Sequence, residues 1–271
     1  MRSTVQIVGI VNITEDSFSD GGRYLEPGQA IAHARQLAAD GAAMLELGPA
    51  SSHPDAAPVP ADRQIERLRP AIEALRGEGR RICVDATDPA VLRFALSAGV
   101  DWLNDIRGFP DASLHAELAA ARAELVVVHS LSRAERADRA LASPRQVLDS
   151  IERFFEARLA ALVRAGVAEE RLIIDPGMGF FLGRDPRASV AVLQRIAVLR
   201  ARFGRPLLVS VSRKSFLREL TGSGIDAIGA ATLSAELFAA RIGADWIRTH
   251  DVRALRDGLA IEAALGQDGI D

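Results

Sequence analysis

The chain has 271 residues, of which 48% are hydrophobic and 25% charged, and its formal net charge is −3. This composition is typical of a globular protein with an ample core, and it gives no sign of a basic surface for nucleic acid or for an anionic membrane. The single cysteine, Cys83, excludes an internal disulfide and a cysteine-rich zinc site, and its apolar neighbours predict that it is buried. With no secretory segment and no long apolar run in the sequence, we expect a cytosolic protein.

Eight short apolar segments alternate with segments of helical periodicity along the chain. The expected strands are 5–11, 44–47, 82–84, 102–103, 125–128, 172–174, 207–211 and 246–247. The expected helices are 27–40, 62–76, 89–98, 113–121, 144–165, 187–203, 228–242 and 252–265. This alternation predicts parallel strands joined by crossover helices, and the uninterrupted apolar strands predict a sheet that is covered on both faces.

Eight strand–helix units in a chain of this size predict an α/β fold, a (β/α)8 TIM barrel formed as a single domain by residues 1–271. The alternative is an open, doubly wound sheet, which a glycine-rich dinucleotide motif after the first strand would favour. Residues 12–22 read Asn-Ile-Thr-Glu-Asp-Ser-Phe-Ser-Asp-Gly-Gly and do not have that pattern. We therefore prefer the barrel.

Polar residues that follow the strands are the candidates for a functional site, because the loops after all eight strands meet at one mouth of such a barrel. They are Asn12, Asp85, Asn104, Asp105, His129, Asp175, Arg213, Lys214, Arg248 and His250. Lys214 stands out because a cation near the start of a helix opposes the helix dipole at a cost of about 0.3–1 kcal/mol, which a nearby electron-rich ligand would explain. Arg248 and His250 are alternate residues of one extended segment, so their side chains face the same way.

Several of these residues also have a purely structural explanation. Asp85 could cap the next helix, but Asp88 is better placed for that, and we expect Asp85 to belong to the site. Asp175 could only start a turn with the proline that follows it, although we favour a role in the site. We expect Asp105 to make local turn hydrogen bonds and His129 to be a satisfied core histidine.

Together these groups indicate a ligand with two ends. Two carboxylates, an amide and an ammonium suit a flat heterocycle with several N–H donors and a carbonyl; they belong to Asp85, Asn104, Asp175 and Lys214. At the other end, Arg248 and His250 form a cationic pair, and strand closure would bring Asn12 beside them. The residues therefore predict an aminated heterocycle that bears phosphate.

Segments 9–22, 104–106, 175–180, 212–214 and 248–251 resemble, in order and spacing, the motifs of dihydropteroate synthases. The resemblance implies an enzyme of folate biosynthesis, a transferase that joins 6-hydroxymethyl-7,8-dihydropterin diphosphate to p-aminobenzoate and releases diphosphate. It also implies a homodimer with small-molecule substrates, and neither nucleic acid nor membrane as a partner. No protein nucleophile is required, in keeping with the absence of a Ser/His/Asp or Cys/His arrangement.

The resemblance also assigns roles to individual residues. It implies that Asp85, Asn104, Asp175 and Lys214 hold the pterin, and that Asn12, Arg248 and His250 hold the diphosphate and its Mg²⁺, with Asn12 as the metal ligand. Catalysis is expected to depend on Lys214, Asp85, Asp175, Arg248 and His250. A substrate contact is also expected from Ser52, which keeps the hydroxyl of the usual threonine.

Two segments depart from the usual family pattern. Residues 48–55 read Gly-Pro-Ala-Ser-Ser-His-Pro-Asp where Gly-Gly-Glu-Ser-Thr-Arg-Pro-Gly is usual, so His53 replaces an arginine. Residues 179–183 read Gly-Phe-Phe-Leu-Gly, which inserts residues around Phe181. Both departures resemble the sulfonamide-resistance dihydropteroate synthases. Phe180 and Phe181 are therefore expected at the substrate site, where a bulky ring could exclude a sulfonamide; alternatively, they only anchor their loop in the core.

Two other functions fit parts of this pattern. A methyltetrahydrofolate-using methyltransferase barrel shares the polar groups that hold a pterin, but it needs no diphosphate site such as Arg248 and His250. An inactive pterin-binding or drug-binding relative would have the same fold without the reaction. No key group is missing from the sequence, so we prefer the enzyme.

Overall fold

The computed structural model describes residues 5–14, 27–51, 56–131 and 143–266. Within this part of the chain, eight parallel strands follow one another in the order β6-β5-β4-β3-β2-β1-β8-β7, and a bridge between Ile174 and Leu207 joins the two ends of the sheet. The strands are β1 (Gln6–Asn12), β2 (Met44–Gly48), β3 (Ile82–Asp85), β4 (Trp102–Asp105), β5 (Glu124–Val128), β6 (Leu172–Asp175), β7 (Leu208–Val209) and β8 (Trp246–Thr249). The predicted TIM barrel is confirmed.

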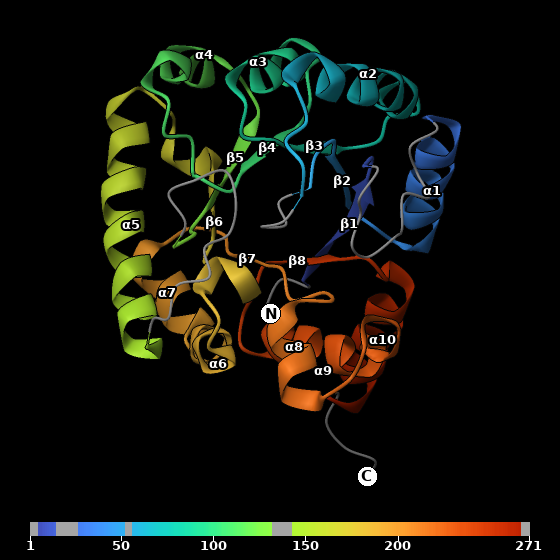
Figure 1. Cartoon of the computed structure of the whole chain (residues 1–271), viewed down its shortest axis with the longest axis vertical. Coiled ribbons are helices and arrows are strands. Elements are labelled where there is room, and N and C mark those ends of the chain that lie inside the picture. Colours follow the sequence, from blue (N-terminus) through green and yellow to red (C-terminus); the bar gives the residue numbers. More distant parts are fainter. Residues whose placement is uncertain (1–4, 15–26, 52–55, 132–142, 267–271) are drawn as a thin grey trace.

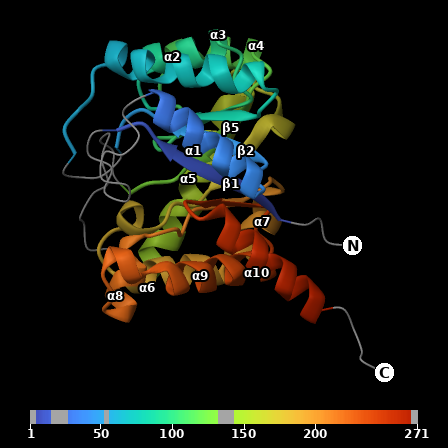
Figure 2. The ribbon, with the colours of Figure 1, turned by 90° about the vertical axis from the view of Figure 1, so that its right-hand side faces the viewer.

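Helices surround the strands on all sides (Figure 1). They are α1 (Pro27–Asp40), α2 (Ala61–Gly77), α3 (Pro89–Ser97), α4 (His115–Ala120), α5 (Pro144–Arg164), α6 (Pro186–Gln194), α7 (Ile196–Phe203), α8 (Ser215–Thr221), α9 (Gly229–Arg241) and α10 (Val252–Leu265). Short 3-10 turns lie at η1 (Ala112–Leu114), η2 (Glu169–Arg171), η3 (Gly179–Leu182) and η4 (Ile225–Ala227). Turning the molecule by 90° shows α9 and α10 lying side by side along one flank of the barrel (Figure 2). None of the described helices is long and apolar enough to cross a membrane.

Three elements differ from the expected ranges. The helix expected at 187–203 is two helices, α6 and α7, because Arg195 between them leaves the helical conformation at φ −105° and ψ 3°. Helix α8 had no range among the expected helices, although Lys214 was expected near a helix start, since seven residues are too few to show a periodicity. Strand β7 has two residues instead of five; the Lys214 N–H bonds the Val211 carbonyl soon after it, which turns the chain toward α8.

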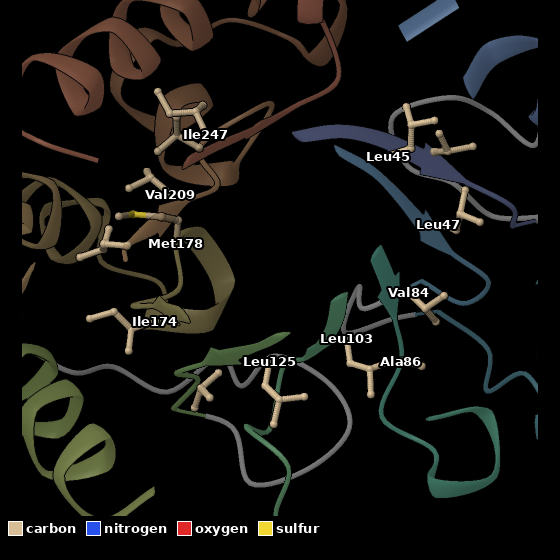
Figure 3. Packing of buried hydrophobic residues seen from close by; sticks show 14 of the residues in the cluster. Leu45, Leu47, Val84, Ala86, Leu103, Leu125, Ile174, Met178, Val209 and Ile247 are labelled. Atoms are coloured by element: carbon tan, nitrogen blue, oxygen red, sulfur yellow. The ribbon is translucent and has the colours of Figure 1, made fainter. Parts of the chain in front are cut away.

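Two clusters of apolar side chains lie on opposite faces of the strands. The larger cluster lies between the strands and the helices and includes Leu45, Val84, Leu103, Ile174 and Ile247 (Figure 3). The smaller cluster draws on the opposite face of the same strands; its buried members are Val8, Met44, Cys83, Trp102, Val126, Val128, Ile173 and Leu208, with Trp246 packed against them. Because successive side chains of a strand point to opposite faces, the smaller cluster fills the inside of the barrel.

Candidate active site

Beyond the apolar interior layer, the inward face of the strands becomes polar. Each strand side chain two residues beyond a member of the smaller cluster also points into the barrel. On five strands this next inward residue is polar: Glu46, Asp85, Asn104, Asp175 and Arg248. The strand register places Asp85 opposite Asn104, and Asp175 opposite the end of β5. Alternation along the strands therefore directs five polar side chains into the downstream mouth of the barrel.

A cavity of 180 Å³ opens at this mouth. Of the residues expected at the site, Asn12, Asp85, Phe180, Phe181, Lys214, Arg248 and His250 line it. Asn104 and Asp175 are buried next to these residues, Asn104 bonded to Asp85 and Asp175 3.6 Å from the Arg248 guanidinium. The structure thus brings nine of the expected residues together, whereas Ser52 and His53 lie outside the described part of the chain.

A buried ion cluster forms the floor of the cavity. The Arg248 Nη1 donates to both carboxylate oxygens of Glu46, at 3.0 and 2.9 Å, and its Nη2 lies 3.6 Å from Asp175 Oδ2. Arg248 and Glu46 are 5% and 4% exposed. Burial lowers the pKa of Arg248, but the charges of Glu46, Asp175 and Asp85 outweigh it and raise the pKa above the ordinary guanidinium value. The guanidinium is therefore a permanent cation that balances the surrounding carboxylates.

Asp85 and Asn104 form one unit on neighbouring strands. Asn104 Nδ2 donates to Asp85 Oδ1 at 2.9 Å, and the amide oxygen of the fully buried Asn104 has no hydrogen-bond partner. Burial, together with the charge of Glu46, raises the pKa of Asp85 to about 7. Since buried acceptors are normally satisfied, the unpartnered amide oxygen fits an N–H donor of a ligand.

Asp175 offers a second buried acceptor that has no hydrogen bond. Its Oδ1 accepts from the Gly177 N–H at 2.8 Å, and its buried Oδ2 has no hydrogen bond. Burial raises the pKa of Asp175, against the opposing effect of the Arg248 charge. Gly177 has φ +74°, and a Cβ there would lie 2.3 Å from the His129 carbonyl oxygen, so only glycine allows this turn.

Lys214 stands at the start of helix α8, as the sequence predicted. Its ammonium lies 4.9 Å from the centre of the Phe181 ring, close enough for a cation–π interaction. Burial lowers the pKa of Lys214 to about 8; the Arg248 charge acts in the same direction, and the Asp175 and Asp85 charges oppose it. Lys214 is therefore mostly charged at neutral pH and close to the carboxylates of the floor.

Phe180 and Phe181 lie in the turn η3, on the wall of the cavity. Phe181 is 5% exposed and packs with Ile106, whereas Phe180 is half-buried. The next residue, Leu182, is fully buried in the large cluster between strands and helices. The Phe181 carbonyl also accepts from the Leu131 N–H at 2.9 Å. The two rings thus face the cavity, while Leu182 anchors the turn in the core.

The chain after β7 and β8 brings to the cavity the groups suited to an anion. His250 Nδ1 lies 2.8 Å from Ser212 Oγ, and Ser212 also accepts from the His250 N–H at 3.2 Å. Both residues line the cavity, together with Asn12, Arg213 and Arg218. Arg213 has φ +57°, a rare conformation for a residue with a side chain, which costs of order 1–3 kcal/mol and is most common at functional sites.

Two other polar residues at strand ends have structural roles, as expected. Asp105 accepts from the N–H groups of Arg107 and Phe109, at 2.8 and 2.9 Å. His129 is 1% exposed and bonds the Pro176 carbonyl and the Ser150 hydroxyl. Burial lowers the pKa of His129 to about 4, so this histidine is neutral at physiological pH. Cys83, also as predicted, is buried inside the barrel.

Sequence reasoning missed two residues of the site. Glu46 was taken as part of an apolar strand, yet a lone charge in the middle of such a strand is itself a signal of a buried partner. Ser212 opened the motif 212–214 but was given no role, because a serine after a strand is common in turns. Both hold a residue that was expected, Arg248 and His250 respectively.

Known proteins share both this fold and this sequence. The family model of pterin binding enzymes matches residues 8–250. Dihydropteroate synthase type-2 of Escherichia coli is 57% identical over 265 residues, which cover 98% of this chain and 97% of that protein.

Two solved structures are similar along almost their whole length. The dihydropteroate synthase of Xanthomonas albilineans with 4-aminobenzoic acid has a TM-score of 0.88 and 34% identity, covering 98% of this chain and 94% of that one. The complex of the Xanthomonas albilineans enzyme with 7,8-dihydropteroate has a TM-score of 0.84 and 32% identity, covering 98% and 95%. The chain therefore belongs to the pterin binding enzymes and, among them, to the dihydropteroate synthases, which are transferases.

Proposed function

We propose that the chain condenses 6-hydroxymethyl-7,8-dihydropterin diphosphate with p-aminobenzoate, giving 7,8-dihydropteroate and diphosphate. The observation that carries this proposal is a single cavity with unlike ends: the Asp85–Asn104 pair on one side and the His250–Ser212 pair on the other. The similar structures with 4-aminobenzoic acid and with 7,8-dihydropteroate support the same substrate and product. The sequence matches favour this reaction over a methyltetrahydrofolate-dependent methyltransferase.

The pterin is proposed to lie over the ion cluster. Its amino and ring N–H groups would donate to Asp85, to the Asn104 amide oxygen and to Asp175 Oδ2, the last two of which have no hydrogen bond in the protein. Lys214 would donate to the ring carbonyl or a ring nitrogen. An unsatisfied buried acceptor costs about 1–3 kcal/mol, so a ligand that fills two of them recovers part of that cost on binding.

The diphosphate is proposed to lie at the other wall, against Asn12, Arg248 and His250. Arg213, which the sequence also predicted at the mouth, is proposed to join these groups, because it lines the same cavity. In the reaction, the bond between the pterin methylene carbon and the diphosphate oxygen breaks first, and the cations stabilise the charge that develops on the leaving group. The arylamine nitrogen then forms the new C–N bond and loses a proton.

Mg²⁺ is proposed to bind together with the diphosphate. Among the described residues, no group of three His, Cys, Asp or Glu side chains could hold a metal. The carboxamide of Asn12 at the cavity wall fits a metal that is held mainly by phosphate oxygens and water. When bound, the ion would neutralise charge on the leaving diphosphate. The homodimer and the cytosolic location stay predictions.

The experiment that tests the function is a direct assay of both products. The purified protein is incubated with the pterin diphosphate and p-aminobenzoate, and diphosphate release and dihydropteroate formation are measured in the same sample. Equal amounts of the two products are expected. Binding of the pterin without diphosphate release would instead identify an inactive relative, and methyl transfer from methyltetrahydrofolate would identify the other alternative.

We further propose that Phe180 and Phe181 make the enzyme insensitive to sulfonamides. Their rings narrow the cavity beside Lys214, and a sulfonamide is larger beyond its sulfonyl group than p-aminobenzoate is beyond its carboxylate. A wall of this kind rejects the larger molecule by steric clash while it admits the smaller one.

Point substitutions test this better than deletion of Phe181 and Leu182, because that deletion would also remove the buried Leu182 from the core. Phe181→Leu and Phe180→Ala are expected to lower the inhibition constant of a sulfonamide at least about tenfold. The KM for p-aminobenzoate should change less. Phe94→Ala, on helix α3, is the matched control. Unchanged inhibition in both cavity variants would refute the proposed exclusion.

A further inference from the structure

Besides its place in the core, His129 binds the turn that carries Asp175. This histidine directly follows β5, and its ring Nδ1 lies 3.2 Å from the Pro176 carbonyl oxygen. Its backbone N–H donates to the Asp175 carbonyl at 2.8 Å. On the other side of the ring, Nε2 lies 3.1 Å from the Ser150 hydroxyl on helix α5. His129 therefore links a helix of the outer layer to the turn after β6.

The partners of the imidazole ring decide where its proton lies. A carbonyl oxygen can only accept a hydrogen bond, so Nδ1 must carry the proton, and Nε2 then accepts from the Ser150 hydroxyl. The ring is neutral at pH 7, because burial lowers the pKa of His129 to about 4. A neutral imidazole has one donor and one acceptor, and this arrangement uses both. His129 is thus fixed in one tautomer and one orientation.

The hydrogen bond to Pro176 reaches Asp175 through a single peptide group. The carbonyl of Pro176 and the N–H of Gly177 belong to the same planar unit and, in a trans peptide, point in opposite directions. On one side the carbonyl accepts from His129, and on the other side the N–H donates to Asp175 Oδ1 at 2.8 Å. Rotation of this plane would break both hydrogen bonds together. The imidazole therefore fixes the donor that holds the carboxylate of Asp175.

The backbone of the turn also lies directly against the chain after β5. A Cβ on Gly177 would lie 2.3 Å from the His129 carbonyl oxygen. Two backbone hydrogen bonds join the same segments, from the His129 N–H to Asp175 and from the Leu131 N–H to Phe181. Neither of these two bonds depends on a side chain. The bond from the imidazole can therefore be removed by substitution while the backbone contacts remain.

The held carboxylate keeps its other oxygen for the cavity. With Oδ1 bonded to Gly177, the Oδ2 atom of Asp175 has no hydrogen bond in the protein and lies 3.6 Å from Arg248 Nη2. The terminal torsion of an aspartate is broad, so the carboxylate is not oriented by its own rotamer. Without the bond to Gly177, either oxygen could turn toward the Arg248 guanidinium. A fixed peptide plane thus favours one orientation of this acceptor.

We propose that His129 is a positioning residue: through the peptide group between Pro176 and Gly177, it orients the carboxylate of Asp175 toward the pterin. The hydrogen bonds are a property of the protein alone, whereas their use rests on the proposed role of Asp175 in binding the pterin. The effect of His129 on pterin affinity should therefore vanish when the carboxylate of Asp175 is removed.

Two substitutions separate the two nitrogens of the ring. Asparagine places its amide close to the position of Nδ1 and can still donate to the Pro176 carbonyl, whereas glutamine places its amide close to Nε2, on the side of Ser150. In calorimetry with 6-hydroxymethylpterin, we expect His129→Gln to raise the dissociation constant about 3–10-fold and His129→Asn to restore most of the affinity. The KM for p-aminobenzoate should change in neither variant.

His115→Gln is the matched control, because His115 Nε2 also bonds a backbone carbonyl, that of Phe109, at 3.0 Å. It should leave the affinity for 6-hydroxymethylpterin unchanged. The same titrations in an Asp175→Ala background, at ligand concentrations raised to match its weaker binding, show whether His129 acts through Asp175. There, His129→Gln should cause no further loss of affinity. A loss by the same factor in both backgrounds would overturn the proposal.

The tautomer of His129 can be read without any ligand, by NMR of the full-length protein labelled with ¹⁵N-histidine at pH 7. The His129 signals are assigned by their loss in His129→Asn. A protonated Nδ1 and an unprotonated Nε2 are expected. A proton on Nε2 would refute the hydrogen bond to Pro176, and unchanged pterin affinity in His129→Gln would refute the positioning of Asp175. Failure of the wild type to bind 6-hydroxymethylpterin would refute the proposed function, even where the NMR result confirms the hydrogen bond.

Discussion

Removal of the Arg248 guanidinium is the sharpest test of the electrostatics at the cavity floor. Arg248 donates to both oxygens of Glu46 and lies 3.6 Å from Asp175, and all three residues are at least 95% buried. Arg248→Met would leave two carboxylates in the interior without their cation. Breaking a buried ion pair in this way costs about 3–5 kcal/mol, so we expect the free energy of unfolding to fall by that amount.

A double-mutant cycle measures the interaction energy between Glu46 and Arg248 apart from the contacts that each makes with other residues. Glu46→Leu should lower the free energy of unfolding less than Arg248→Met does, by about 1.5–3 kcal/mol, because Arg248 still faces the Asp175 carboxylate. The double variant Glu46→Leu with Arg248→Met should cost less than the sum of the two single changes, by about 0.5–3 kcal/mol. Glu46 and Arg248 are thus expected to act as one unit, although 202 positions separate them in the sequence.

The assay is urea-induced unfolding at pH 7, with the slope of each transition checked so that the free energies can be compared. Arg35→Met is the control, since Arg35 pairs with Glu78 on an exposed surface. Arg35→Met should not measurably change the free energy of unfolding, because exposed ion pairs contribute little to stability. A cost for Arg248→Met as small as that of the control, or strict additivity in the cycle, would refute the reasoning.

Two further predictions concern stability. Burial raises the pKa of the Glu236 carboxyl group from 4.5 to about 8 in the folded protein. Because the folded protein binds this proton more tightly than the unfolded chain does, the proton contributes to stability. The contribution is complete below pH 4.5 and is lost as the pH rises through about 8. Glu236→Gln should therefore gain roughly 3–5 kcal/mol relative to the wild type between pH 5 and pH 9, measured by denaturant unfolding; parallel pH curves would contradict this. Gly177→Ala should unfold more easily than Gly204→Ala, because both have positive φ but only Gly177 would place a Cβ 2.3 Å from a carbonyl oxygen. Equal losses in the two thermal melts would argue against the clash.

Most of the fold could be predicted from the sequence, because apolar strands and amphipathic helices are local patterns and they alternate along the chain. The cap at Asp88 was predictable too, and its side chain accepts from the Ala90 N–H. The break at Arg195 was not predictable, because nothing in its local sequence marks the end of a helix. Tertiary packing, and not propensity, decides such positions.

The sequence predicted which residues belong to the site, but not which of them bond to one another. Position at the end of a strand was enough to place Asp85, Lys214 and His250 at one cavity. The sequence could not show that Arg248 would be bound by Glu46, since the pairing depends on which face of β2 points inward. A slip of one residue in a strand would send Glu46 to the outer face.

The most direct test of the two-ended cavity is the binding of two ligands that differ in one end only. Calorimetry would compare 6-hydroxymethylpterin with its diphosphate in Asn104→Leu and His250→Gln. Asn104→Leu should weaken both ligands by a similar factor, about 10-fold or more, because it removes an acceptor at the pterin end. His250→Gln should weaken only the diphosphate. Equal weakening of both ligands by His250→Gln, or no effect of Asn104→Leu on either ligand, would contradict the account.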